Sequence, residues 1–171
     1  VEYLCERKPI VMCRGRSESG PRALGNRSIM CVPDMENGRD FLNFQIKKRE
    51  WYRPYAPIIL DKYVDDVLED YLPESPYMST SGTIKKEWRD RLSAVNHVDN
   101  STRPQILKNE HNPFMYDLIE RVYERTGIPV LLNTSFNKQE PIVETPEEAI
   151  NTFKQFDNIG LMVLHNMQVI K

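Results

Sequence analysis

Short hydrophobic runs alternate along the chain with stretches in which hydrophobic residues recur at helical spacing. A short continuous apolar run is typical of a buried strand. Such runs predict strands at residues 9–13, 28–32, 55–60, 94–98, 105–107, 129–132, 159–164 and 168–170. Strands that alternate with amphipathic helices predict a layered α/β or α+β domain.

Hydrophobic residues three and four positions apart predict helices between these strands. Asn112-Pro113 opens one helix and Gly127 ends it, since proline suits the first helical position and glycine the residue after the last. Thr145 and Glu148 form a capping box at the start of a helix that reaches Phe156. Two further helices are predicted, at 38–48 with Phe41, Leu42 and Ile46 inward, and from a capping Asp61 to Tyr71 with Val64, Val67 and Leu68 inward.

Residues 73–94 show neither pattern and contain many Pro, Ser, Gly and Thr residues. We interpret them as a surface excursion or a lid, and expect them to be mobile and near the mouth of the site. Residues 1–6 resemble the end of a helix, and the chain begins with Val1. We therefore expect residues 1–171 to form a single domain cut from a longer protein.

Polar residues follow two of the predicted strands where they end. In sheets of this class, ligands bind beyond the carboxyl ends of strands. That rule singles out residues 14–28, after the first strand, and residues 133–137, after the strand at 129–132. In the first of these, Gly20-Pro21 predicts the start of a helical turn that ends at Gly25. Free N–H groups at that turn would form an anion site; the alternative is a solvated basic loop.

The charge distribution favours a small anionic ligand. The net charge is −2, which counts against a general binder of nucleic acids or membranes. Residues 14–53, however, hold nine Lys and Arg against five Asp and Glu, whereas the rest of the chain holds 14 against 20. A compact basic site in an acidic body fits a small anion better than a long polyanion.

Three cysteines without metal-ligand spacing predict reduced thiols and a cytoplasmic location. No apolar run approaches the length of a membrane span. The three histidines are scattered, so we expect no metal site in this chain.

Two groups of residues suit phosphate chemistry. Lys47 and Arg49, with Arg53 one helical turn later, present a point charge and two planar guanidinium groups to phosphate-like oxygens. Ser135 and Asn137 supply neutral hydrogen-bonding groups. No Ser/His/Asp arrangement supports Ser135 as a nucleophile, so we expect it to act as a hydrogen-bond donor.

Four blocks of the chain, which together run nearly from end to end, match the motifs of one known family in the same order: Gly15–Ile29, Ile46–Pro57, His97–Gln105 and Leu132–Glu147. In these blocks the chain resembles the carboxy-terminal domain of the O-carbamoyltransferases of nodulation-factor and antibiotic biosynthesis. Two departures are Ser19, at a position usually aromatic, and Asn100-Ser101-Thr102, which replaces a commoner glycine-containing loop.

The resemblance implies a YrdC-like fold, a twisted mixed parallel and antiparallel sheet with flanking helices. It implies that the domain uses ATP, Mg²⁺ and carbamoyl phosphate to make carbamoyl-adenylate and pyrophosphate. An N-terminal kinase-like domain, absent here, would transfer the carbamoyl group to an acceptor hydroxyl. The implied catalytic residues are Lys47, Arg49 and Ser135, and the implied substrate-binding residues are Arg16, Arg22, Arg53, His97, Arg103, Asn133 and Asn137.

Other interpretations remain open at this point. The chain could be a non-catalytic nucleotide- or RNA-binding module, although its acidic pI of about 6.0 counts against RNA. It could also be an interaction domain that completes a partner's fold. Single residues have structural alternatives as well: surface ion pairs for Arg14 and Arg27, a core role for His97, a turn for Asn133, a solvated Lys48, and a core or stacking role for Tyr52, Tyr55 and Phe136.

Overall fold

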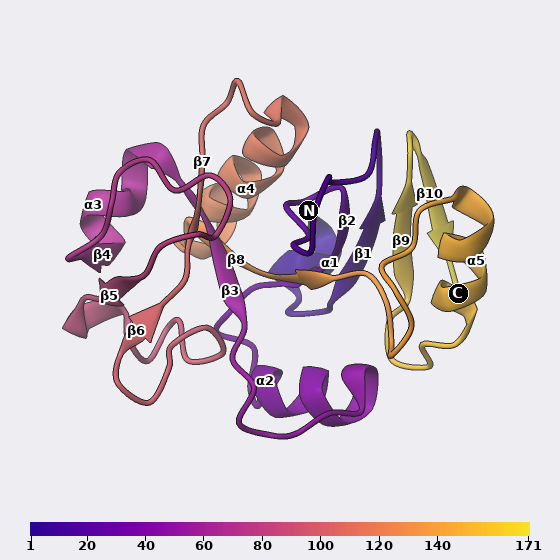
Figure 1. The fold of residues 1–171 in the computed structure, drawn as a ribbon, viewed down its shortest axis with the longest axis horizontal. Coiled ribbons are helices and arrows are strands. Elements are labelled where there is room, and N and C mark those ends of the chain that lie inside the picture. Colours follow the sequence, from indigo (N-terminus) through magenta and orange to yellow (C-terminus); the bar gives the residue numbers. More distant parts are fainter.

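A computed structural model describes residues 1–171, and a seven-stranded sheet forms its centre (Figure 1). The strand order is β10-β9-β1-β2-β8-β3-β7. The β1–β9 and β3–β7 pairs are parallel and the other neighbours antiparallel, so the predicted mixed sheet is confirmed. The strands are β1 (Ile10–Cys13), β2 (Arg27–Cys31), β3 (Ala56–Leu60), β7 (Gln105–Leu107), β8 (Val130–Ser135), β9 (Leu161–Leu164) and β10 (Met167–Ile170).

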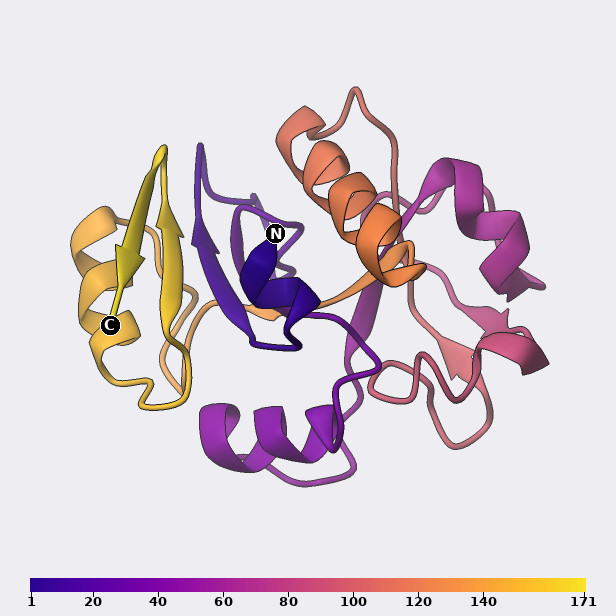
Figure 2. The same cartoon turned by 180° about the vertical axis from the view of Figure 1, so that it is seen from behind.

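Helices flank this sheet, and a second, three-stranded sheet lies beside it. Figure 2 shows the N-terminal helix α1 next to the long helix α4 on one side of the molecule. The small sheet consists of β4 (Leu68–Glu69), β5 (Gly82–Ile84) and β6 (Ser101–Thr102). The helices are α1 (Glu2–Cys5), α2 (Gly38–Asp40), the π-helix η1 (Phe41–Lys47), the 3₁₀ helices η2 (Asp61–Tyr63) and η3 (Lys86–Trp88), α3 (Val64–Val67), α4 (Pro113–Thr126) and α5 (Pro146–Lys154). None of them has the length and hydropathy needed to span a bilayer.

The boundary signals of α4 and α5 are confirmed. The Asn112 side chain accepts a hydrogen bond from the Met115 amide at 3.1 Å. Gly127 ends α4 in the left-handed region, at φ 68°, which glycine adopts without strain. The reciprocal capping box of Thr145 and Glu148 opens α5. These caps form because each needs only residues within one turn of the other.

The helix predicted from Asp61 to Tyr71 is wrong beyond Val67. Leu68 enters β4 instead and pairs with Ile84 of β5, a residue from the segment that showed no pattern. Pairing with a distant strand therefore overrides the helical spacing of hydrophobic residues. Asp61 does not cap this helix either, and its carboxylate accepts a hydrogen bond from the Tyr116 hydroxyl.

Two other local predictions are also wrong. Residues 94–98 form turns and irregular loop, not a strand, and their buried Ala94 and Val95 pack into the core without strand pairing. Residues 20–25 form bends, not a helical turn. There the Glu18 carboxylate accepts hydrogen bonds from the amides of Leu24 and Asn26, both at 2.7 Å. One amide of the predicted anion-binding turn, that of Leu24, is thus already satisfied by the protein's own carboxylate.

Residues 73–94 contain more regular secondary structure than their composition indicates. They contain β5 and η3, and their buried residues are Ser75, Met78, Gly82, Ile84, Leu92 and Ala94. Dense packing at these positions rules out a loop that is detached from the core throughout. The surface positions among them, such as the two-thirds exposed Tyr77, are the part for which mobility stays a prediction.

The helix predicted at 38–48 is present, but residues 41–47 wind as a π-helix. Leu42 and Ile46 are fully buried, as expected, and Phe41 is partly buried. The π-helix also buries two polar residues, Asn43 and Lys47, which the hydrophobic pattern does not mark. Such turns are rare and are frequently found at functional sites.

Candidate functional site

The two polar segments singled out in the sequence meet at one edge of the sheet. β1 and β8 both pair antiparallel with β2, so their carboxyl ends lie at the same edge. Asn133, near the end of β8, donates a hydrogen bond from Nδ2 to the Ala23 carbonyl at 2.7 Å. Because Asn133 lies within β8, its alternative role in a turn is excluded.

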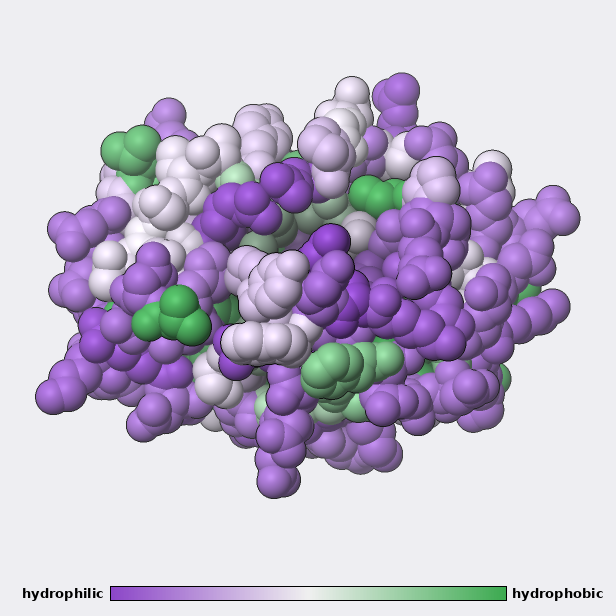
Figure 3. Space-filling model, turned by 60° about the horizontal axis from the view of Figure 1, so that its bottom comes forward, coloured by the Kyte–Doolittle hydropathy of each residue, from purple (hydrophilic) through white to green (hydrophobic).

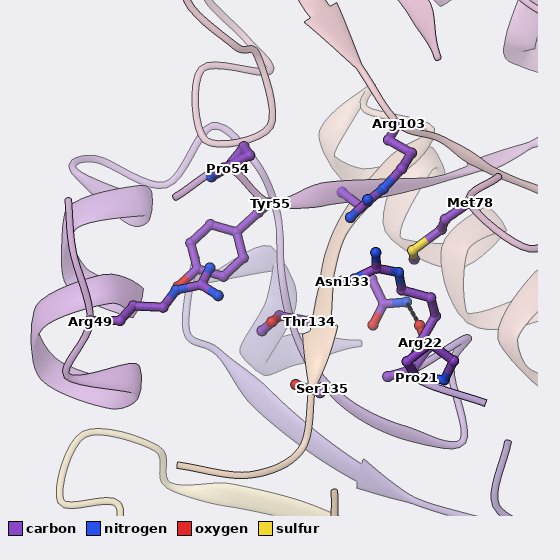
Figure 4. A pocket seen from close by; sticks show the side chains of 12 residues that line it. Pro21, Arg22, Arg49, Pro54, Tyr55, Met78, Arg103, Asn133, Thr134 and Ser135 are labelled. Carbon is purple, nitrogen blue, oxygen red and sulfur yellow. Dashed lines mark hydrogen bonds between the residues drawn. The ribbon is translucent and has the colours of Figure 1, made fainter. Parts of the chain in front are cut away.

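A small cavity of about 120 Å³ lies between these segments (Figure 4). Arg49 and the Tyr55 ring line one side of it, and Arg22 and Arg103 approach from the other side of β8. The remaining polar lining comes from β8 itself, through Asn133, Thr134 and Ser135.

A larger, open depression of about 450 Å³ adjoins this cavity, and the two share Arg49 and Ser135. We call the two together the basic groove. Seven bases line it against the single acid Glu50: Arg22, Lys47, Lys48, Arg49, Arg53, Arg103 and Lys138. Figure 3, which turns the side of α2 and η1 toward the reader, shows a mainly hydrophilic face with a hollow near its centre.

Three polar atoms of the small cavity are buried and have no hydrogen-bond partner: Arg49 Nη2, Arg103 Nε and Asn133 Oδ1. Unpaired buried polar groups are costly, and native proteins contain few of them. Two donors and one acceptor unpaired around one small cavity are the arrangement expected where a polar, anionic ligand completes the hydrogen bonding.

Lys47 lies at the junction of η1 and β8 and is only 4% exposed. Its Nζ donates to the Ser135 carbonyl at 2.5 Å, the Asn137 carbonyl at 2.9 Å and Asn137 Oδ1 at 2.6 Å, and lies 3.3 Å from Ser135 Oγ. Burial, together with the nearby charge of Arg49, lowers the pKa of Lys47 from 10.5 to about 7, while Glu140 opposes this shift. The structure thus unites the two sequence groups, Lys47-x-Arg49 and Ser135-x-Asn137, in one hydrogen-bonded cluster.

Ser135 and Asn137 hold each other as well as Lys47. Ser135 Oγ donates to Asn137 Oδ1 at 2.7 Å, and Asn137 Nδ2 donates to the Glu140 carbonyl at 2.6 Å. Arg53 lines the open depression, where its Nε pairs with Glu50 at 2.8 Å in a half-exposed ion pair. Such a pair is worth little and exchanges easily, so Arg53 remains accessible to a ligand.

Arg16 and His97 do not line the basic groove. Arg16 is exposed on the loop after β1. His97 is partly buried, with its Nδ1 3.3 Å from Ser101 Oγ, and burial lowers its pKa. The other eight residues implied by the resemblance all line it.

The surface ion pairs considered for Arg14 and Arg27 are absent. Arg27 is buried, and its guanidinium donates to the carbonyls of Arg14, Gly15, Asn26 and Glu144, so it holds the loop after β1 together. Arg14 stacks over the Phe114 ring at 4.2 Å. Phe136 and Tyr55 are buried, whereas Tyr52 and Lys48 are exposed.

Sequence reasoning missed Asn43 and Met78. Met78 lines the small cavity from the 73–94 segment. Asn43 accepts a hydrogen bond from Arg49 Nε at 2.7 Å, and the Arg49 guanidinium lies 4.5 Å from the centre of the Tyr55 ring. The one signal for Asn43 in the sequence is its position three residues before Ile46. This spacing places a polar residue next to the face of the predicted helix that should be apolar.

Comparison with known proteins agrees with the resemblance. The family model for the carbamoyltransferase C-terminus matches residues 1–171. Nodulation protein NolNO of Sinorhizobium fredii is 41% identical over 165 residues, 95% of this chain and 24% of its own length. Nodulation protein NolO of Bradyrhizobium diazoefficiens is 42% identical over 153 residues, 88% of this chain and 28% of its own length.

The fold also matches a solved structure of low sequence identity. A crystal structure of full-length HypF in the phosphate- and nucleotide-bound form superposes with a TM-score of 0.62 and 17% identity, covering 99% of this chain and 21% of that one. This likeness confirms the fold. The chain thus spans about a quarter of the length of the curated relatives it matches.

Proposed function

Because the chain belongs to the carbamoyltransferase C-terminal family, we propose that its basic groove binds ATP·Mg²⁺ and carbamoyl phosphate and forms carbamoyl-adenylate. The observation that carries this proposal is the trio of unpaired buried atoms, Arg49 Nη2, Arg103 Nε and Asn133 Oδ1, around a cavity within a groove of seven bases and one acid. Such a surface suits two small anionic substrates that must be brought together.

The proposed reaction has two steps, a hydrolysis and an adenylation. Water cleaves carbamoyl phosphate to carbamate and inorganic phosphate. A carbamate oxygen then attacks the α-phosphorus of ATP, the bond from that phosphorus to the bridging oxygen breaks, and pyrophosphate leaves with the electron pair. Both partners of the second step are anions, so the groove must first offset their repulsion.

The residues of the groove supply this offset in different ways. Arg22, Arg49 and Arg103 surround the small cavity with planar donors that suit phosphate oxygens. Lys47 contributes its charge through the hydrogen-bonded Ser135 and Asn137, which both line the open depression. Removing one donor of this type typically costs on the order of 2.7–4 kcal/mol of transition-state stabilisation.

The groove is compatible with Mg²⁺ that enters with the nucleotide. Glu50 is its single carboxylate and is paired with Arg53, so the protein offers the metal one acidic ligand at most. Mg²⁺ is commonly bound by substrate phosphates, water and one or two carboxylates. When bound, the ion would neutralise phosphate charge.

The family model and the structural neighbour agree with this proposal at a coarser level. HypF, a similarly folded chain, was crystallised with phosphate and nucleotide. Because this chain spans only about a quarter of the nodulation proteins, we propose that another domain, kinase-like in fold, passes the carbamoyl group to an acceptor hydroxyl. We expect this domain to be its partner within the full-length protein, in the cytoplasm.

The test is pyrophosphate release by the chain, measured with ATP·Mg²⁺ in the presence and absence of carbamoyl phosphate. We expect release that requires carbamoyl phosphate and falls at least about tenfold in Arg49→Ala and in Ser135→Ala. Lys86→Ala, which changes an exposed lysine outside the groove lining, is the matched control and should behave as the wild type. No release from the wild type would disprove independent adenylation by this chain.

Calorimetry separates the alternatives if release is absent. Binding of ATP·Mg²⁺ without turnover would favour a nucleotide-binding module. Loss of that binding on addition of RNA would favour an RNA-binding module. Binding of neither nucleotide nor RNA would leave an interaction domain as the best account.

A further inference from the structure

The π-helix η1 buries a polar side chain that neither the motifs nor the proposed chemistry includes. Asn43 is completely buried. So are Leu42 and Ile46, which lie in the same helix. Burying an amide is unfavourable unless its hydrogen bonds are made. Its partners therefore indicate what it does.

Asn43 makes every hydrogen bond of which its side chain is capable. Oδ1 accepts from Arg49 Nε at 2.7 Å and from the Tyr55 hydroxyl at 2.8 Å. Nδ2 donates to the carbonyl of Trp51 at 3.1 Å and to that of Arg53 at 3.2 Å. Exchanging the oxygen and nitrogen would place donors against donors, so this pattern fixes the orientation of the amide.

All four partners lie in residues 49–55, the segment that carries Arg49 and Arg53 along the basic groove. The side chains of Trp51 and Tyr52 in this segment are more than half exposed, so they contribute little to holding the segment in place. The Asn43 carbonyl adds a hydrogen bond from the Arg49 amide at 2.9 Å. One buried residue thus ties a mostly exposed segment to the core.

The same contacts set the orientation of the Arg49 guanidinium. Nε is held by Asn43 Oδ1, and the guanidinium plane lies over the Tyr55 ring at 4.5 Å. Nη2 is left buried and without a partner beside the small cavity. Holding Nε therefore aims the far end of the guanidinium at the space where a ligand would bind.

We propose that Asn43 is a positioning residue, which orients Arg49 for an anionic group of the substrate by holding its Nε and the segment 49–55. This inference rests on the proposed function for the identity of the anion. It adds a residue that does not line the groove itself and acts on the ligand through Arg49. That dependence separates it from a residue that merely stabilises the fold.

The first measurement reads the contact itself, without any ligand. In ¹H–¹⁵N spectra of the wild type, we expect one resolved, slowly exchanging Arg Nε–H signal that disappears in Arg49→Lys. The same signal should exchange rapidly in Asn43→Ala. If the wild-type signal is averaged with those of exposed arginines, Asn43 does not hold Arg49 and the proposal is overturned, even if Asn43→Ala fails to fold.

The second measurement is a double-mutant cycle on ATP·Mg²⁺ affinity, with wild type, Asn43→Ala, Arg49→Ala and the double variant. We expect each single change to weaken binding roughly tenfold, the scale of one hydrogen bond to a charged group. In the Arg49→Ala background, Asn43→Ala should change affinity by less than about twofold. Equal effects of Asn43→Ala in both backgrounds would show a structural role only and overturn the proposal.

Thr145→Ala serves as the control for lost stability, because it removes the α5 capping box outside the groove. Its melting temperature should fall while its ATP·Mg²⁺ affinity stays at the wild-type value. The two proposals also fail separately. A wild type that binds no ATP·Mg²⁺ overturns the proposed function, whereas the Arg49 Nε signal still decides whether Asn43 positions this arginine.

Discussion

Lys47 shows how a single buried cation can serve two purposes in one site. Its Nζ lies among four oxygens of Ser135 and Asn137, more than the three hydrogens of an ammonium group can satisfy at once. It therefore binds the end of β8 to η1, and it adds positive charge beside the groove. The positive charge requires the protonated form, and burial lowers the pKa of Lys47 from 10.5 to about 7.

We predict that anion affinity and stability respond to pH in opposite directions because of Lys47. Above pH 7 the folded protein loses the ammonium, so ATP·Mg²⁺ affinity should fall, by at most about tenfold per pH unit. Between pH 7 and 10.5 the unfolded chain binds more protons at this residue than the folded chain does. The contribution of Lys47 to the free energy of unfolding should therefore rise with pH over the same range.

Calorimetric titrations and denaturant unfolding from pH 6.5 to 9, each compared with Lys47→Met, check this prediction. Methionine has a similar length and no charge, so the difference between the two proteins isolates Lys47. A difference that does not vary with pH would show that the Lys47 pKa lies outside this range.

At the scale of elements, the segment 73–94 joins two different environments. Ile84 of β5 donates its amide to the Asn100 carbonyl at 2.9 Å within the small sheet. Met78 lines the small cavity of the groove, while its neighbour Tyr77 is exposed. The segment is therefore anchored at β5 and open to solvent next to the site.

We predict that hydrogen exchange divides this segment. The Ile84 amide should exchange slowly and the amides of Tyr77 and Ser79 rapidly, because only the first lies in a paired strand. Adding ATP·Mg²⁺ and carbamoyl phosphate should slow exchange around Met78. Exchange at Tyr77 as slow as at Ile84 would contradict the mobility expected for the surface part.

At the scale of the molecule, the groove lies where distant parts of the chain meet. The Arg22 loop, η1, the 73–94 segment and β8 all contribute to it. A ligand that contacts all of them binds the folded chain and not the unfolded one. Binding should consequently stabilise the whole molecule.

We predict that ATP·Mg²⁺ at 100 times its Kd raises the melting temperature by about 5–10 °C, from about 2.7 kcal/mol of binding free energy in a domain of this size. At the same nucleotide concentration, Arg22→Ala should show a clearly smaller shift, because Arg22 lines the small cavity. Arg16→Ala, on the same loop but outside the groove, should keep most of the shift. Equal losses for both variants, measured by scanning calorimetry, would contradict this boundary of the groove.

The sequence by itself determined the features that depend on neighbours along the chain. The caps at Asn112, Gly127 and Thr145 connect residues within one helical turn, so local chemistry suffices to predict them. The same holds for the apolar runs of β1, β3 and β8. Because β1 and β8 end in polar segments, the rule for the carboxyl ends of strands also pointed to the edge of the sheet where the basic groove lies.

The tertiary structure decided the features that depend on partners far along the chain. Lys47 meets Ser135 and Asn137 across 88 and 90 positions, and Leu68 leaves its predicted helix to pair with Ile84. Glu18 accepts a hydrogen bond from the Leu24 amide, in the turn predicted to bind an anion, and the π-helix places Asn43 beside Arg49. Long-range pairing and the need to satisfy buried polar groups decided the structure at these residues, since a polar group that is buried without a hydrogen-bond partner is costly.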